Sequence, residues 1–307
     1  MKSRNTLPTV AAILVSSFLA ACGSKSSLST PIVLTDGLNR HITLPQPAAR
    51  IVSLTPSNTE LLYEVGAGAQ VVGRDDFSDF PLEARGLPSV GGSLEAYNID
   101  AIVALKPDLV LAAQINTPEQ VASLEGRGLT VFYLNNPKDL AGLFQNMETV
   151  GTLTGKTDQA TTLIQSLVVR VEAVIDKLPN ITTHHKVYYE IDATNATMPY
   201  TAGPGSYIHT VLEKAGDDNV GAYLGVPYGA VPVEEVIAQN PGFILLGDAV
   251  YGVTVASVSA RPGWAATDAV KNGRVFAFDD DTINRPTARI VDAIENLAKL
   301  FHPEAFE

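Results

Sequence analysis

The chain has 307 residues, of which 46% are hydrophobic and 18% are charged, as in an ordinary folded globular protein. Its 33 acidic residues outnumber its 21 Lys and Arg residues, which gives a formal net charge of −12. This length allows one large domain or two medium ones. The acidic balance argues against a nucleic-acid partner, because nucleic acid requires a basic face.

The first 21 residues have the features of an export signal. A short basic segment, MKSRNT, precedes an apolar run that suits a signal-peptide core and is shorter than the roughly 20 residues of a membrane-spanning helix. Cys22 follows and is the only cysteine of the chain, and LAAC (19–22) is similar to a bacterial lipobox. We therefore expect removal of 1–21, lipid on Cys22 and a flexible tether over 22–30. The protein would then be exported and held at the outer face of the cytoplasmic membrane, touching lipid only through this anchor.

Residues 31–145 alternate between strand and helix patterns and begin with a predicted hairpin over 32–44. Residues 51–66 predict a strand and then a helix that Ser57 or Asn58 caps. Strand and helix signals continue in the same order to residue 134. This alternation predicts an N-terminal lobe with a mostly parallel sheet and helices on both of its faces.

One long helical tract follows, from about residue 139 to residue 178, and we assign 146–180 to a connecting helix. GTLTGKT (151–157) has three residues between its first Gly and its Gly-Lys, where a phosphate-binding loop has four. We interpret it as a turn at a helix start. Strand and helix signals then resume over 181–307, which predicts a C-terminal lobe.

Two distant segments of the chain are nearly copies of one another. IDAIVALKPDLVL (99–111) and VEEVIAQNPGFIL (233–245) align Asp100 with Glu234 and Pro107 with Pro241. Each predicts a short helix that stops before Pro and is followed by a buried strand. Their separation is too wide for a solenoid repeat, so they predict two similar α/β lobes.

We find no residue pattern that predicts catalysis, a cofactor or a bound metal. Among the five histidines only His184 and His185 are adjacent, and neighbours in a strand point to opposite faces. The three acids at 279–281 are predicted to form a solvated loop. An exported two-lobe enzyme would need a nucleophile–base pair or a metal cluster; that enzyme and an adhesive lipoprotein are the alternatives from other functional classes.

Seven segments resemble the substrate-binding lipoproteins of ABC importers for iron chelates and cobalamin, and the resemblance is closest to the cobalamin-binding members. The segments are RIVSLTPSNTELLYEVG (50–66), NIDAIVALKPDLVLA (98–112), YTAGPGSYI (200–208), VPVEEVIAQNP (231–241), ARPGW (260–264), VKNGRVFAF (270–278) and RIVDAIENLAKLFHPEAF (289–306). The resemblance implies an α/β fold with two Rossmann-like lobes, one long rigid α-helix that joins them, and a ligand cleft between them. It further implies a monomer that captures cobalamin or a related corrinoid and delivers it to a membrane permease.

The resemblance also implies which residues act. Aromatic rings suit a large flat ligand, and the predicted ligand-binding residues are Tyr133, Tyr200, Tyr228, Arg285, Ser57 and Asn58. Glu119 and Glu234 match the acids with which each lobe of the cobalamin-binding relatives docks onto Arg pockets of the permease.

Two small residues bear on the choice of ligand. Ala113 stands where a cobalamin-binding relative has Trp, which opens the wall of the first lobe. Gly92 stands where haem-binding relatives usually carry an iron-ligating Tyr, which argues against haem. Ferric siderophores are the alternative cargo, since relatives that bind anionic siderophores use cleft arginines. Arg74, Arg261 and Arg285 are the candidates for that role, whereas Trp264 is predicted to pack in the core.

Overall fold

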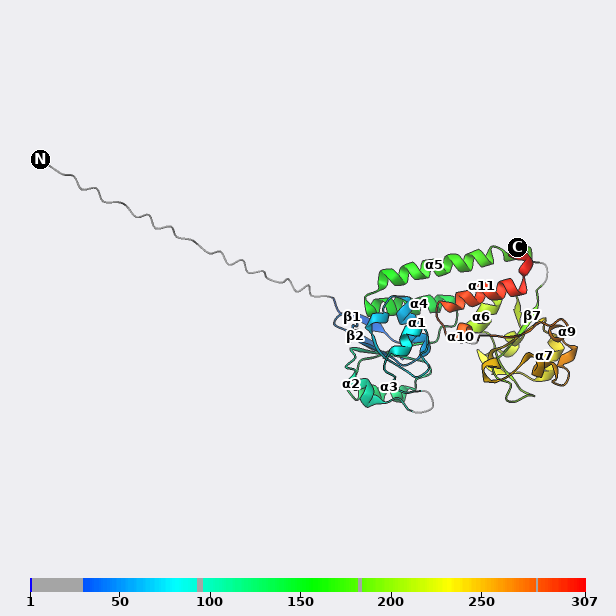
Figure 1. Ribbon diagram of the computed structural model, residues 1–307, viewed down its shortest axis with the longest axis horizontal. Helices are drawn as coiled ribbons and strands as arrows, with labels where there is room; N and C mark the ends of the chain where they lie inside the picture. Colours follow the sequence, from blue (N-terminus) through cyan, green and yellow to red (C-terminus); the bar gives the residue numbers. More distant parts are fainter. Residues whose placement is uncertain (2–29, 93–95, 182–183, 280) are drawn as a thin grey trace.

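The computed structural model describes residues 1, 30–92, 96–181, 184–279 and 281–307. The predicted signal peptide, Cys22, most of the tether and Asp280 lie outside these residues. Within the described ranges, we find no helix with the length and apolarity required to cross a membrane. Figure 1 shows two lobes side by side, with a long helix passing over both.

The N-terminal lobe is built on a four-stranded parallel sheet with the order β4-β3-β5-β6. The hairpin predicted over 32–44 is confirmed, because two antiparallel strands place Ile32 opposite Leu44. The elements of this lobe are β1 (Ile32–Thr35), β2 (His41–Leu44), β3 (Ile51–Ser53), α1 (Pro56–Glu64), β4 (Val71–Arg74), α2 (Ile99–Ala104), β5 (Leu109–Ala113), α3 (Pro118–Glu125) and β6 (Val131–Leu134).

The C-terminal lobe repeats this plan with a parallel sheet of order β12-β11-β7-β9 and adds an antiparallel pair, β8 with β10. Its strands are β7 (Lys186–Glu190), β8 (Tyr200–Ala202), β9 (Asp218–Asn219), β10 (Tyr228–Ala230), β11 (Phe243–Leu246) and β12 (Val275–Ala277). Its helices are α6 (Tyr207–Lys214), α7 (Val233–Gln239), α8 (Val255–Ser259), α9 (Asp268–Lys271), α10 (Asp281–Asn284) and α11 (Arg289–Phe301).

The internal repeat of the sequence is also a repeat of structure. α2 leads into β5 and α7 leads into β11, as the two aligned segments predicted. The backbone agrees as well, since Lys106 and Asn240, each directly before the shared Pro, have φ values of 48° and 49°. Both helices therefore end in the same left-handed turn, which sends the chain back into the sheet.

The helical tract between the lobes is two helices, α4 (Leu140–Thr154) and α5 (Thr157–Ile175), so the connecting helix begins at residue 157 and not at 146. Gly155 ends α4 with φ 69°, and the Lys156 N–H donates to the carbonyl of Gly151 at 2.7 Å. Glycine adopts this conformation without a Cβ penalty. Within 151–157, residues 155 and 156 thus form the turn between the two helices. From this turn α5 passes from one lobe to the other (Figure 1).

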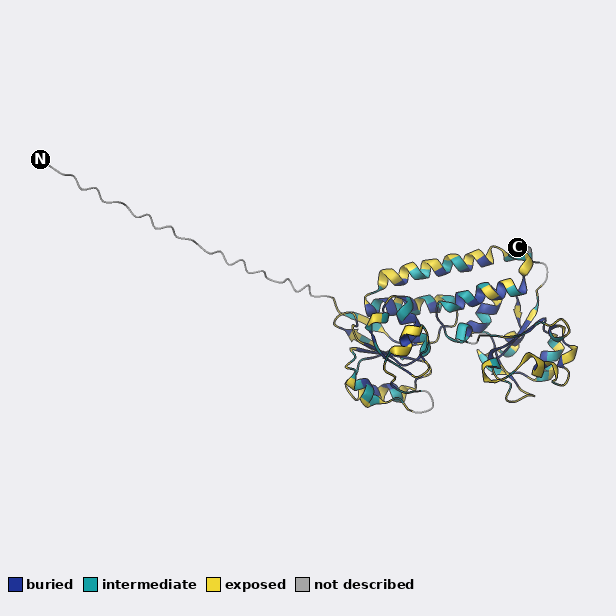
Figure 2. Ribbon diagram, in the orientation of Figure 1, coloured by how far each residue is buried: buried dark blue, intermediate teal, exposed yellow. Residues whose placement is uncertain are grey.

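One hydrophobic core runs through both lobes on the side of α5. It joins Leu62 and Met147 of the N-terminal lobe to Leu167 of α5 and to Tyr189 and Phe301 of the C-terminal lobe. Figure 2 shows buried residues on α4 and α11, beneath an α5 whose outer side is exposed. The opposite face of each sheet packs in a separate hydrophobic cluster that lies within its own lobe. Because close-packed cores resist deformation, the shared core limits relative movement of the lobes near α5.

Candidate functional site

A cavity of about 200 Å³ lies between the lobes. Its lining comes from both lobes and consists of Thr55, Pro56, Ser57, Ala113, Ile115, Asn136, Asn284, Arg285 and Pro286. The residues of the N-terminal lobe lie at or just after the carboxyl ends of β3, β5 and β6. Ligands of parallel α/β sheets bind at these strand ends, so the cavity has the position expected of a binding site.

The start of α1 shapes one wall of this cavity. Thr55 is the N-cap, and its Oγ1 accepts a hydrogen bond from the Asn58 N–H at 3.4 Å, with Pro56 at the first helical position. The cap predicted at Ser57 or Asn58 is therefore wrong by two or three residues, since Pro56 is preorganised for the helix start. Ser57, one of the predicted ligand-binding residues, lines the cavity. Asn58 does not, because it is buried and its Nδ2 donates to the carbonyl of Leu111 at 3.2 Å.

Tyr133 is part of the N-terminal core, contrary to the prediction of a ligand contact. Its side chain is only 6% exposed and belongs to the separate hydrophobic cluster of that lobe, with Val52 and Val110. Successive residues of a strand point to opposite faces. β6 therefore turns Tyr133 toward the face of the sheet opposite the shared core, and Asn136, just beyond the strand, reaches the cavity.

Tyr200 and Tyr228 lie together on the β8–β10 pair, outside the lining of the cavity. The Tyr200 hydroxyl donates to the carbonyl of Tyr228 at 3.3 Å, and the Tyr200 side chain is 42% exposed. Tyr228 packs against the shared core, and burial raises the pKa of its hydroxyl. A third tyrosine, which the sequence did not single out, supports the cavity wall: the Tyr207 hydroxyl donates to the carbonyl of Asn284 at 2.7 Å.

Arg285, one of the predicted ligand-binding residues, borders the cavity, but three carboxylates already hold its guanidinium. Its Nη1 donates to Glu60 Oε1 at 2.9 Å and to Asp79 Oδ1 at 2.8 Å, and its Nη2 is 2.9 Å from Asp281 Oδ2. Glu60 and Asp79 belong to the N-terminal lobe, whereas Arg285 and Asp281 belong to the other. Arg285 thus links the two lobes through ion pairs, and we call this group of charged residues the ionic joint.

Glu60 is the centre of this joint. Its carboxylate has no exposed surface and also accepts from the Thr287 hydroxyl at 3.2 Å and from Arg289 Nη1 at 3.3 Å. Arg289 in turn lies 4.6 Å from the ring of Phe80 in the N-terminal lobe. The sequence does not single out Glu60, because its partners Arg285 and Thr287 lie more than 220 residues away.

Glu64, one turn further along α1, accepts a hydrogen bond from the Ala288 N–H, with both carboxylate oxygens 3.1 Å away. This N–H is at the start of α11, where the helix dipole favours a negative charge. Burial first, and then the neighbouring carboxylates of Glu60 and Asp292, raise the pKa of Glu64 to about 7 despite this hydrogen bond. The joint therefore contains a carboxyl group that titrates near neutral pH.

The other two candidate arginines are also occupied by protein groups. Arg261 forms a bidentate pair with the buried Glu190, at 2.6 and 2.8 Å. Trp264 lies 5.0 Å from the Arg261 guanidinium and is 1% exposed, so the prediction that it packs in the core is confirmed. Arg74 donates to the carbonyls of Ala84 and Asp75, at 3.0 and 2.7 Å.

The family of this fold follows from comparison with known proteins. The family model of periplasmic binding proteins matches residues 51–282. This chain is a periplasmic binding protein. It is 28% identical over 310 residues to the uncharacterized ABC transporter substrate-binding lipoprotein YvrC of Bacillus subtilis, covering 97% of each chain. It is 30% identical over 281 residues to a cobalamin-binding protein of Halobacterium salinarum, covering 89% of this chain and 75% of that one.

A solved structure agrees with this assignment. The haem-binding protein RhuT from Roseiflexus sp. RS-1, in its apo form, matches the periplasmic binding protein with a TM-score of 0.74 and 26% identity, over 84% of this chain and 99% of that one. The predicted resemblance and the predicted two-lobe α/β fold are thereby confirmed. The names of these relatives refer to different ligands, so membership of the family does not by itself identify the ligand of this chain.

The two acids predicted to dock this periplasmic binding protein are both exposed, in the first turns of α3 and α7. These helices lie on the side of the lobes away from α5 (Figure 1). Within the described ranges neither Glu119 nor Glu234 has an ion-pair partner. The pKa of Glu119 is lowered by its own backbone N–H and by the Thr117 hydroxyl, which keeps the carboxyl charged.

Proposed function

We propose that this periplasmic binding protein is the lipid-anchored receptor of an ABC importer and carries cobalamin or a related corrinoid in the cleft between its lobes. The named lipoprotein relative and the lipobox-like LAAC (19–22) support anchoring at Cys22. The cobalamin-binding relative supports the ligand class.

The choice of ligand depends on the ion pairs that Arg285 forms. Three carboxylates surround this one guanidinium at the cavity, so a ligand carboxylate or catecholate would meet excess negative charge. Arg261 and Arg74 are likewise engaged with protein groups. Cyanocobalamin carries no net charge and has amide groups around its rim. Hydroxyl and amide side chains of the cavity, such as Thr55, Ser57 and Asn136, suit such groups as hydrogen-bond partners.

Haem fits this cleft less well, because its propionates are anionic. Gly92, where haem-binding relatives carry a ligating Tyr, has φ 99°, and a Cβ at this position would collide with the ring of Tyr97. A tyrosine side chain at this position would therefore displace its neighbours.

A neutral or cationic ferric siderophore is the second candidate. A solved structure of a possible iron-binding solute-binding protein from Staphylococcus epidermidis matches this fold with a TM-score of 0.72 and 26% identity, covering 83% of this chain and 99% of that one. A chelate without negative charge would not compete with Glu60, Asp79 and Asp281 for Arg285.

Calorimetric titration of residues 30–307, which contain both lobes and their cores, tests the ligand. Cyanocobalamin should bind one-to-one with a Kd below about 1 μM. Neutral ferrichrome tests the second candidate, and haemin and ferric enterobactin, both anionic, should give no binding. Tight binding of an anionic chelate would overturn the charge argument, and binding of ferrichrome alone would replace the corrinoid.

We also propose that Glu119 and Glu234 dock the two lobes onto cationic pockets of the permease. Two separated charges with cationic partners fix orientation and raise the rate of association. Replacing both by Ala should leave the Kd for ligand unchanged and impair uptake by cells. Asp158→Ala on α5, an exposed acid on the opposite side, is the matched control. Normal uptake by the double variant would contradict the docking role.

A further inference from the structure

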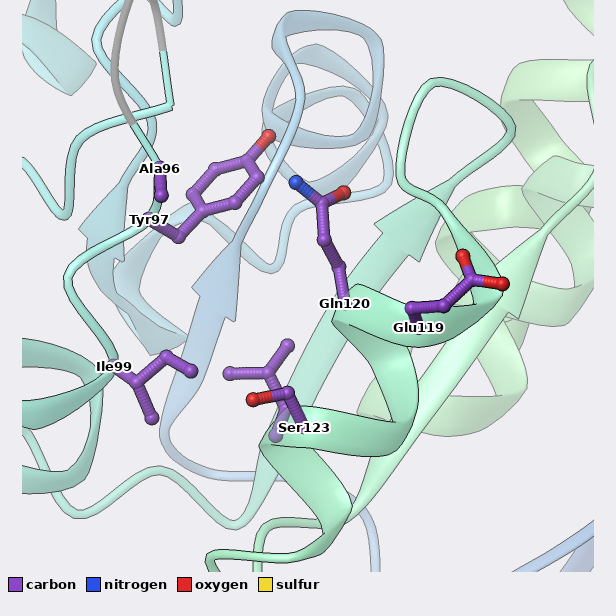
Figure 3. A pocket seen from close by; sticks show the side chains of 7 residues that line it. Ala96, Tyr97, Ile99, Glu119, Gln120 and Ser123 are labelled. Atoms are coloured by element: carbon purple, nitrogen blue, oxygen red, sulfur yellow. The ribbon is translucent and has the colours of Figure 1, made fainter.

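A groove of about 260 Å³ lies beside Glu119, on the exposed side of the N-terminal lobe. Tyr97 and Ile99 form one wall, before and at the start of α2, and Gln120, Ser123 and Leu124 of α3 form the other. In Figure 3 the Tyr97 ring and Ile99 face α3 across the groove, and the Glu119 carboxylate points outward at its edge.

The groove is held open by hydrogen bonds within the lobe. The Tyr97 hydroxyl donates to the carbonyl of Leu54 at 2.7 Å and accepts from Asn116 Nδ2 at 2.8 Å, which fixes the ring. On the other wall, the Thr117 N–H donates to Gln120 Oε1 at 2.9 Å in a capping box that fixes the first turn of α3. A site shaped before binding loses less freedom when a partner fills it.

The volume and the charge at the edge define what fits. A dry cavity of about 150 Å³ can hold a benzene molecule, so this groove has room for a Leu, Met or Phe side chain. Glu119, exposed and without an ion-pair partner among the described residues, favours a cation next to that apolar group. The occupant is therefore a segment with an apolar residue beside Arg or Lys.

Two other occupants are disfavoured by charge. A second copy of this chain would bring a molecule of formal net charge −12 against an acidic edge. An anionic lipid surface would be repelled by the same carboxylate. A cationic protein surface fits both features of the groove.

We propose that this groove is a socket in which an apolar side chain of the permease inserts, while a neighbouring Arg of the permease pairs with Glu119. The proposal rests on the docking role of this face. It assigns the N-terminal lobe a shape-specific contact in addition to its charge, so that this lobe is recognised by packing as well as by attraction.

Ser123→Trp tests the socket by filling it, and Ala122→Trp is the control, since Ala122 is the exposed neighbour on α3 outside the groove. The binding of each full-length variant to the ABC permease in nanodiscs, without added ligand, is measured by biolayer interferometry. We expect Ser123→Trp to weaken binding at least about tenfold and Ala122→Trp to change it less than about threefold. Melting temperature and ligand affinity should be unchanged in both.

Ser123→Leu, a smaller filler, replaces Ser123→Trp if the larger side chain lowers the melting temperature, and it should weaken binding in the same direction. If a Ser123 variant that folds normally binds the permease with wild-type affinity, the socket proposal is wrong. Glu119→Gln and Glu234→Gln, measured beside it, separate the two proposals. If the two Glu variants weaken binding and the Ser123 variants do not, the docking role is supported and the socket proposal is wrong. If neither the Glu variants nor the Ser123 variants weaken binding, both proposals are wrong.

Discussion

The two lobes have the same order of strands in their parallel sheets, but the two acids proposed to dock the permease lie on helices that do not correspond. Asp100 at the start of α2 is the repeat partner of Glu234 at the start of α7. Asp100, however, forms an ion pair with Arg127 at 2.5 Å, and the N-terminal lobe instead exposes Glu119 one helix later. The repeat therefore preserves what folding requires, a helix stop, a left-handed turn and a buried strand. It leaves the surface charges free to differ.

The same contrast holds inside the lobes. One face of each sheet packs into a core that both lobes share, and the other face packs in a separate cluster within its own lobe. At the edge of the shared side, Glu60 and Glu64 of one lobe meet Arg285, Thr287 and Ala288 of the other. The lobes are thus joined by apolar packing and by ionic contacts, and each kind of joint can be broken separately.

The largest effect is expected from the shared core. Phe301→Ala at the end of α11 should lower the free energy of unfolding by about 4 kcal/mol, because Phe301 is 3% exposed and its loss leaves a cavity. Hydrogen exchange should quicken in α4 as well as α11, since both contribute to one core. Tyr251→Ala, at an 84% exposed side chain, is the control and should change little. Faster exchange confined to the C-terminal lobe would show that the cores act independently.

The ionic joint should come next. Glu60→Gln should lower the free energy of unfolding by about 3 kcal/mol, because it leaves Arg285 and Arg289 without their buried counter-charge. Asp79→Asn removes a carboxylate that is 44% exposed and should cost below about 1 kcal/mol. Urea denaturation of the two variants measures the difference. If the two variants lose the same free energy of unfolding, burial of Glu60 does not determine how much its ion pairs stabilise the protein.

Glu64 should make the joint sensitive to pH. Its pKa is raised from 4.5 to about 7 in the folded protein, so the folded state binds the proton more tightly than the unfolded chain does. The stability that this proton contributes is present below about pH 4.5 and is lost as pH rises to about 7. The stability of the wild type relative to Glu64→Gln should fall by about 3 kcal/mol between pH 4.5 and 8. A parallel pH profile for the two proteins would remove Glu64 from the pH response.

The smallest effect is expected at Asp100, the repeat partner of Glu234, which is one of the two acids proposed to dock the permease. Asp100→Ala breaks an ion pair whose side chains are 82% and 49% exposed, which should change the free energy of unfolding by less than about 1 kcal/mol. It should also leave uptake unchanged, whereas Glu119→Ala should impair it. Impaired uptake in Asp100→Ala alone would mean that the repeat-equivalent acids dock the lobes.

Local patterns in the sequence determined the parallel lobes, the repeat and the order of elements, because prolines, left-handed turns and apolar runs act over a few residues. The resemblance to a known family, rather than these local patterns, pointed to Ser57 and Arg285, which both line the cavity. Only the tertiary structure decided that Glu60 would hold Arg285 across 225 residues, that Tyr133 would face the core, and that Tyr97 and α3 would enclose a groove. These features depend on which face of each element meets a distant neighbour, and the spacing of residues along the chain does not encode that choice.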